Sequence, residues 1–482
     1  MQLEQRFPDG LLDHAVEIGA VTERSVRAWV RKPHAGHVEG TLSIDGERAA
    51  EASTALSEDS DWTGTLQFDL DMPAPGTEFQ INVDGFVRRA VFAPTPGEPA
   101  RLTFGFGSCN RPFQLEGDEI VYHQAAGIYD ALQNDLVRAD GRFVLLAGDQ
   151  IYSDEIDPIS VRSDHLDDEG WLPTPEETLD AYRQISRGYL HVSGFQRLRN
   201  GLPTLTIWDD HDIFDNWGSR REVSTLDRRM FDAASRAYYE YQHIRNPGPH
   251  AGQPPYHYAY QYGDIGFFVL DVRGQRDWRS GKILGDRQWK DLTDYLGNQS
   301  NERITTLFIV SSVPVAHVAR WMARAFEHLP GVFGDSVRDR WSAAAYRDQR
   351  ERLLQLLFDW QTAAPGRQAI VLSGDVHVAG AYTIQPRSGP GRIEQFTSSA
   401  FTTPLSSFER YLNVIAARGS NLFESRWTFQ RHFIDYSNNA GLVRLTPLES
   451  GGHHVELLIR GWNRRERRLR TVARLASTPG DR

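Results

Sequence analysis

The sequence predicts an α/β protein with a largely parallel sheet, preceded by a smaller β-sandwich. From about residue 101 onward, short apolar runs alternate with stretches of helical periodicity, the order that is typical of β-α units. Residues 20–93 instead show alternation of apolar and polar residues with hairpin turns between the runs. The length of 482 residues also exceeds what one compact core of ordinary size needs, so two structural units are expected.

The N-terminal unit is expected to span residues 1–98 and to be immunoglobulin-like. Its clearest alternating runs are residues 26–30, 66–70 and 79–83. Asp45-Gly46 and Asp84-Gly85 are favourable hairpin turns. The unit carries no cluster of histidine, cysteine or paired acids, so we expect it to be a packing module. A role in substrate access is the alternative.

The second unit, residues 99–482, is expected to hold the chemistry. Helices are predicted over 120–137, 176–199, 226–244, 286–296 and 348–360, with Asp286 as an N-cap. Buried strands are predicted over 102–106, 143–147, 205–208, 267–271, 307–312 and 369–373. After residue 382 the pattern turns to strands, including 442–446 and 455–459.

Four of these strands run directly into polar residues that bind metals. The blocks are Ser108-Cys109-Asn110, Gly148-Asp149-Gln150-Ile151-Tyr152, Asp209-Asp210-His211-Asp212 with Asp215-Asn216, and Gly374-Asp375-Val376-His377. Buried carboxylates are usually paired or bound to a metal. Open α/β sheets place their sites outside the carboxyl ends of the strands. The pattern therefore predicts a metal site at this edge.

Each block also has a structural interpretation. Taken alone, Asp149 is more typical of a turn cap, Tyr152 of a core tyrosine and Cys109 of a small buried apolar side chain. The acidic block has the form of a solvated loop, but Trp208 and Trp217 beside it favour burial. Four such blocks at four strand ends favour the metal site.

Composition excludes several other functions. The chain has 64 acidic and 53 basic residues, a net charge of −11, which disfavours non-specific binding to nucleic acid or anionic membranes. No apolar run is long enough for a transmembrane segment, and the first residues do not form a secretory signal, so a cytoplasmic location is expected. Cys109 is the single cysteine, which excludes an intramolecular disulfide. The oligomeric state stays open.

The four blocks resemble the signature blocks of PhoD-type alkaline phosphatases, members of the calcineurin-like metallophosphoesterase superfamily. The resemblance covers Arg101 to the end of the chain. It implies a metallophosphoesterase-type αββα sandwich, and hydrolysis of a small-molecule phosphomonoester or phosphodiester by metal-activated water. The alternatives are a phosphotriester or other ester hydrolase on the same metals, and a non-catalytic relative that binds phosphate esters.

The resemblance also implies roles for individual residues. Iron(III) would be held by Cys109, Asp149, Tyr152 and His377, and a divalent metal by Asp149, Asp210, Asp375 and Asn216. Thiolate and phenolate suit iron(III), whereas oxygen ligands suit a hard cation, Ca²⁺ being expected and Mn²⁺, Mg²⁺ or Zn²⁺ being alternatives. His211 would lie beside the phosphate, as a charge stabiliser or proton donor.

Two further features affect the expected chemistry. The family usually has two asparagines where this chain has Asp215-Asn216, so an extra negative charge is expected near the divalent metal. Arg273 follows a predicted strand on the same side and is expected to bind phosphate, a surface salt bridge being the alternative.

Overall fold

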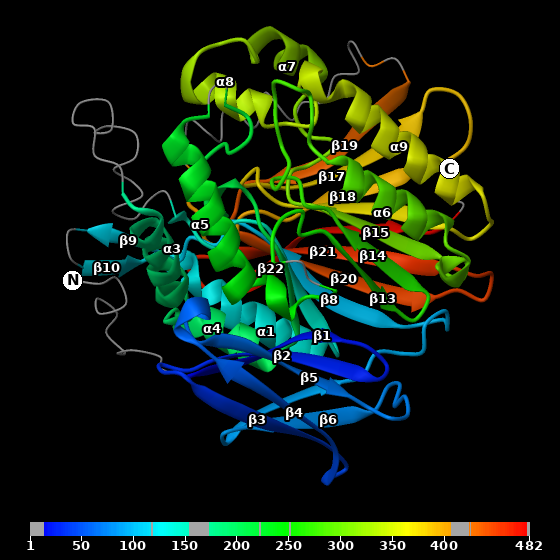
Figure 1. Cartoon of the computed structure of the whole chain (residues 1–482). Helices are drawn as coiled ribbons and strands as arrows, with labels where there is room; N and C mark the ends of the chain where they lie inside the picture. Colours follow the sequence, from blue (N-terminus) through cyan, green and yellow to red (C-terminus); the bar gives the residue numbers. More distant parts are fainter. Residues whose placement is uncertain are drawn as a thin grey trace.

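The computed structural model describes residues 14–116, 119–153, 173–220, 223–249, 252–405, 424 and 426–479 (Figure 1). The N-terminal strands form two antiparallel sheets, drawn in blue beneath the larger sheets. The first contains β1 (Ala15–Val21), β2 (Ser25–Arg31) and β5 (Thr63–Asp69), and the second contains β4 (Glu47–Leu56), β3 (Gly36–Ile44), β6 (Glu78–Val83) and β7 (Phe86–Val91). Apolar side chains of both sheets share one core, as predicted for a sandwich.

Two larger sheets follow. The six-stranded sheet has the order β12 (Thr204–Ile207), β11 (Phe143–Ala147), β8 (Leu102–Gly107), β20 (Asn439–Pro447), β21 (His453–Asn463) and β22 (Arg468–Ser477). The seven-stranded sheet has the order β13 (Tyr258–Tyr262), β14 (Ile265–Val269), β15 (Thr306–Ser311), β16 (Gln368–Ser373), β18 (Ile393–Thr397), β17 (Ala379–Pro386) and β19 (Trp427–Asp435). A short hairpin pairs β9 (Phe113–Glu116) with β10 (Glu119–Tyr122).

The two large sheets pack face to face through aromatic side chains. The ring of Phe104 on β8 lies 5.5 Å, between centroids, from the rings of Phe267 on β14 and Phe308 on β15. All three rings belong to one apolar core that draws on both sheets. Aromatic rings that pack edge to face at this centroid distance hold the two sheets at a fixed separation.

Helices cover the outer faces. The principal helices are α1 (Ile128–Arg138), α3 (Pro175–Leu190), α4 (Ser193–Gly201), α5 (Thr225–Tyr241), α6 (Asp286–Gly297), α7 (Arg320–Phe326), α8 (Gly331–Arg338) and α9 (Arg347–Thr362). Apolar residues of α1 join the core of the six-stranded sheet, and those of α6 and α9 join a second core on the seven-stranded sheet. The predicted αββα sandwich is therefore confirmed. In the part of the chain that is described, no helix is both long and apolar enough to cross a bilayer.

Some predicted details were wrong. Both large sheets are mixed. In the six-stranded sheet β20, β21 and β22 add antiparallel, and in the seven-stranded sheet β13, β17 and β19 do. The helix predicted from residue 120 begins at Ile128, since Ile120 pairs with Leu115 in a hairpin. The helix predicted over 176–199 divides at Val192, whose backbone is extended, and Gly285 rather than Asp286 is the N-cap of α6. The unit boundary near residue 98 stays a prediction.

Candidate metal centre

The four predicted blocks meet where the two large sheets approach each other. Those after β8, β11 and β12 come from adjacent parallel strands of one sheet, and the block after β16 comes from the other sheet. Hydrogen bonds join them, since the amide of Asn110 donates to the carbonyl of Asp149 at 2.8 Å, and that of Asp375 donates to the hydroxyl of Ser108 at 3.2 Å.

Glycine precedes two of the acids because a larger residue does not fit. A Cβ on Gly374 would lie 2.2 Å from the hydroxyl of Ser108 in the opposite sheet. A Cβ on Gly148 would lie 2.7 Å from the Cβ of Asp209, at a backbone φ of +102°. Both Gly-Asp pairs therefore permit the loops to approach closely enough for their acids to face one another.

The backbone of the predicted ligands is unusual. Five of these residues have a positive φ: Cys109 (57°), Asp149 (51°), Asn216 (59°), Asp375 (66°) and His377 (56°). Side-chain-bearing residues rarely adopt this region, and where they do, the surrounding structure holds them, often at functional sites. The residues with this unusual backbone conformation are thus residues that are predicted to bind metals.

The first group of ligand atoms is compact. Single ligand atoms of Cys109, Asp149 and His377 all lie within 4.8 Å of one another. The thiol of Cys109 donates to Asp149 Oδ2 at 3.2 Å, and the phenol oxygen of Tyr152 lies 3.2 Å from His377 Nε2. The four residues predicted to hold iron are therefore brought together.

A second group shares Asp149. Oxygens of Asp149, Asp209 and Asp210 also lie within 4.8 Å of one another, and all three side chains are buried. Asp209 was not predicted as a ligand, yet its Oδ2 is buried without a hydrogen-bond partner in the described residues. Burial raises the pKa of Asp149 well above its usual range, and the neighbouring Asp209 raises it further. Such a group fits a cation, whose charge offsets the repulsion between the carboxylates.

Of the remaining predicted ligands, Asn216 contacts Asp210, whereas Asp375 belongs to none of the compact groups of ligand atoms in the described residues. The amide of Asn216 donates to Asp210 Oδ2 at 2.7 Å, but its side-chain amide donates to Asp215 at 2.7 Å. The carboxylate of Asp375 forms an ion pair with Arg340. The backbone carbonyl oxygen of Asp375 lies 3.6 Å from the sulfur of Cys109.

His211 lies against the first group. Its ring stacks on the ring of Tyr152 with centroids 4.2 Å apart, and its amide donates to Asp149 Oδ1 at 3.3 Å. Its Nε2 lies 4.0 Å from Asp215 Oδ1, and 16% of its side chain is exposed. The imidazole is thus held beside both groups with access to solvent.

Arg273 takes a different place from the one expected. Its side chain is fully buried, so it forms neither a surface salt bridge nor, in this conformation, an open phosphate contact. It donates to Asp209 and to Asp339, and lies 3.3 Å from Asp210 Oδ1. Arg273 therefore forms ion pairs with these acids on the buried side of the site.

The sequence model of the PhoD-like phosphatases matches residues 107–446, which include all the predicted ligands. The chain belongs to the PhoD-like phosphatase family. It is 26% identical over 313 residues to alkaline phosphatase D of Bacillus subtilis, covering 60% of this chain and 48% of that protein. It is 23% identical over 323 residues to an uncharacterised protein of Saccharomyces cerevisiae, covering 49% and 44%. The chain spans about half the length of these curated relatives.

Solved structures support the same fold. The structure of PhoD aligns with a TM-score of 0.67 at 17% identity, covering 96% of this chain and 88% of that one. A purple acid phosphatase from yellow lupin aligns with a TM-score of 0.57 at 11% identity, covering 96% and 74%.

Asp212 supports this PhoD-like centre, although sequence reasoning gave it no role. Its carboxylate accepts hydrogen bonds from the amides of Asp209, Gln150 and Ile151, so it joins the loops after β11 and β12. Burial raises its pKa to about 7. In the sequence Asp212 is one of four acids in a short run, and this pattern does not show which acids bind a metal and which hold the loops.

Sequence reasoning also missed the hydroxyl groups around Cys109 and Tyr152. The hydroxyl oxygen of Ser399 lies 2.9 Å from the sulfur of Cys109. Thr403 donates to the phenol oxygen of Tyr152 at 2.9 Å. Both lie far along the chain in a stretch without a recognisable motif, so only the folded structure brings them here.

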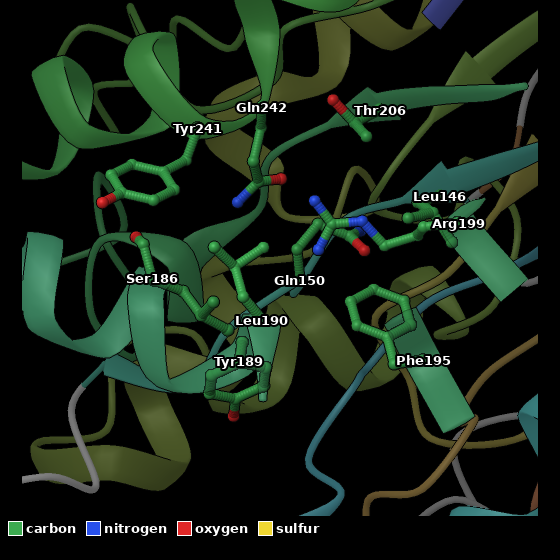
Figure 2. Close-up of a pocket in the computed structure, with 11 residues that line it drawn as sticks. Leu146, Gln150, Ser186, Tyr189, Leu190, Phe195, Arg199, Thr206, Tyr241 and Gln242 are labelled. Carbon is green, nitrogen blue, oxygen red and sulfur yellow. The ribbon is translucent and has the colours of Figure 1, made fainter. Parts of the chain in front are cut away.

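A small cavity lies behind the centre among α3, α4 and α5. Its lining includes Gln150, Arg199 and Gln242, whose side chains surround it in Figure 2. It has room for about one water molecule. None of the predicted ligands lines it, and Gln242 donates to Asp212 at 3.3 Å. The cavity is therefore part of the support of the acids and not the metal site.

Proposed function

We propose that this PhoD-like chain is a two-metal phosphoesterase that hydrolyses phosphomonoesters, phosphodiesters or both. The observation that carries the proposal is the position of Asp149. Its carboxylate belongs both to the group with Cys109 and His377 and to the group with Asp209 and Asp210. A shared carboxylate is what a bridged pair of metals requires.

The chemical types of the ligand atoms also differ between the two groups. Sulfur, phenol and imidazole of Cys109, Tyr152 and His377 would hold iron(III) on one side of Asp149. Oxygen donors from Asp209 and Asp210, joined by the predicted ligands Asp375 and Asn216, would hold a divalent cation, Ca²⁺ or Mn²⁺, on the other. When bound, the metals would lower the pKa of a water molecule and polarise the phosphoryl oxygens.

The residues of the chain supply orientation and a proton. His211 is fixed by its stack on Tyr152, and its Nε2 side faces Asp215. A protonated imidazole there would stabilise charge on the phosphate or donate its proton to the leaving oxygen. Hydrolysis by water then needs no covalent intermediate on a side chain.

Metal content and visible absorption of protein purified without chelator test this proposal first. We expect about one iron per chain, with a broad visible band that disappears in Tyr152→Phe. We also expect turnover of phosphomonoesters or phosphodiesters. About two equivalents of manganese or zinc in a colourless protein would still support a two-metal phosphoesterase, but would contradict the assignment of iron. Preference for uncharged substrates would indicate a triesterase, and binding of phosphate esters without turnover a non-catalytic relative.

A further inference from the structure

Arg340 forms an ion pair with Asp375, the predicted ligand of the divalent metal that comes from the seven-stranded sheet. Arg340 lies just after α8, and the sequence pattern assigns this residue no role in the centre. Its guanidinium supplies positive charge at the carboxylate where a bound cation is expected. The two cations would therefore compete for Asp375.

The backbone at Arg340 is held in place by its neighbour. Asp339 is fully buried and accepts hydrogen bonds from Arg273 at 2.9 Å and from Ser219 at 2.6 Å, while its carbonyl accepts from Arg276. Arg273 also reaches the acids after β12. A continuous set of buried ion pairs thus ties the position of residue 340 to the candidate metal ligands.

Exposure distinguishes Arg340 from the other arginines of this region. The side chains of Arg273 and Arg276 are fully buried and that of Arg338 is 2% exposed. The side chain of Arg340 is 18% exposed, while its partner Asp375 is 7% exposed. Among these four arginines, Arg340 has the most exposed side chain, although the Nη1 atom that pairs with Asp375 is itself buried.

We propose that Arg340 binds the phosphate of the substrate, leaving Asp375 when a divalent cation takes that carboxylate. The inference rests on the proposed function and assigns to Arg340 the role expected from the sequence for Arg273. The planar guanidinium matches two oxygens of a phosphate, so the incoming anion replaces the carboxylate that the cation has taken. The ligand class is a phosphate ester with at least two free oxygens.

Two titrations test the proposal with readouts other than turnover. In the first, inorganic phosphate is titrated into manganese-loaded protein by calorimetry. Arg340→Ala is expected to weaken phosphate binding by about 10- to 100-fold, and Arg340→Lys by less, because lysine keeps the charge but not the planar pair of donors. In the second, Mn²⁺ is titrated into metal-free protein. Arg340→Ala is expected to bind Mn²⁺ more tightly, because the competing guanidinium is gone.

Arg279→Ala is the matched control, since Arg279 is an exposed arginine of the turn that follows Arg273. It is expected to bind phosphate and Mn²⁺ as the unmodified protein does. Phosphate binding that is equal in Arg340→Ala and the unmodified protein overturns the proposal. Weaker Mn²⁺ binding in Arg340→Ala overturns it too, because it would show that Arg340 only positions Asp375. Failure of the proposed function has a different signature, namely normal metal and phosphate binding without turnover of any ester.

Discussion

The hydroxyl of Thr403 donates a hydrogen bond of 2.9 Å to the phenol oxygen of Tyr152. The same hydroxyl lies 2.9 Å from the carbonyl of Cys109, so one side chain contacts two of the residues proposed to hold iron. A donor to a ligating oxygen withdraws electron density from it and thereby changes the energy of charge transfer to the metal.

Thr403→Val is therefore expected to shift the visible band of the iron-loaded protein, whereas Thr403→Ser keeps the donor and leaves the band in place. The absorption spectrum of each variant at equal iron content measures this. An identical band in Thr403→Val and the unmodified protein would show that the hydroxyl does not act on the phenolate.

Asp149→Asn is expected to lower the content of both metals, because the residue belongs to both ligand groups. Activity should fall by at least about 100-fold, more than the loss of an indirect support causes. Asp232→Asn, at an exposed position on α5, is the control and should keep metal and activity. Loss of one metal only would restrict Asp149 to one side of the centre.

Much of this centre could be predicted from the sequence, and the reason is local. Cys109, Asp149 and Asp210 each follow an apolar strand directly, and adjacent parallel strands place such residues at one edge. Arg340 could not be predicted, because nothing in the pattern of its segment points to Asp375 in a distant part of the chain. The burial of Arg273 was equally hidden, since it depends on Asp339 in the same distant segment.

Asp339→Asn is expected to lower the free energy of unfolding by about 3–5 kcal/mol, because it removes one partner of a buried ion pair with Arg273. Denaturant titration measures the change. Asp294→Asn is the matched control, since Asp294 pairs with Lys290 at the surface, where 59% and 73% of the side chains are exposed. That change should leave the free energy of unfolding nearly unchanged, because water screens an exposed ion pair. Equal losses in the two variants would refute a special role for the buried network.

Glu17 on β1 gives the stability a dependence on pH. Burial raises the pKa of Glu17, but Arg199 and Arg245 outweigh burial and hold the pKa below its usual value of 4.5. Because the folded-state pKa is lower than the unfolded one, the stabilisation is present above about pH 4.5 and is lost as pH falls further. Glu17→Gln should therefore show a smaller loss of stability between about pH 5 and 3 than the unmodified protein.

Urea midpoints across this pH range measure the difference. Glu39→Gln, in which the exposed Glu39 lies in the same N-terminal unit, should follow the unmodified protein. Parallel curves for Glu17→Gln and the unmodified protein would mean that other acids account for the whole dependence.

Substrate preference offers a separate prediction for Arg340. A phosphomonoester carries one more negative charge than a phosphodiester near neutral pH, so it gains more from a guanidinium. Arg340→Ala should lower kcat/KM for a monoester by about tenfold more than for a diester of the same leaving group. Both values come from initial rates on nitrophenyl esters, with Arg279→Ala as the control. An equal decrease for the two esters would argue against contact with the extra oxygen.

The two large sheets each contribute part of the ligand set, so the space between the sheets determines how well the parts fit. The rings of Phe104, Phe267 and Phe308 pack against one another in that space. The size of these rings therefore sets the distance between the two sheets, and with it the distance between the two parts of the ligand set. A change in the size of one of these rings is therefore expected to move the two parts of the ligand set relative to each other, with every ligand left unchanged.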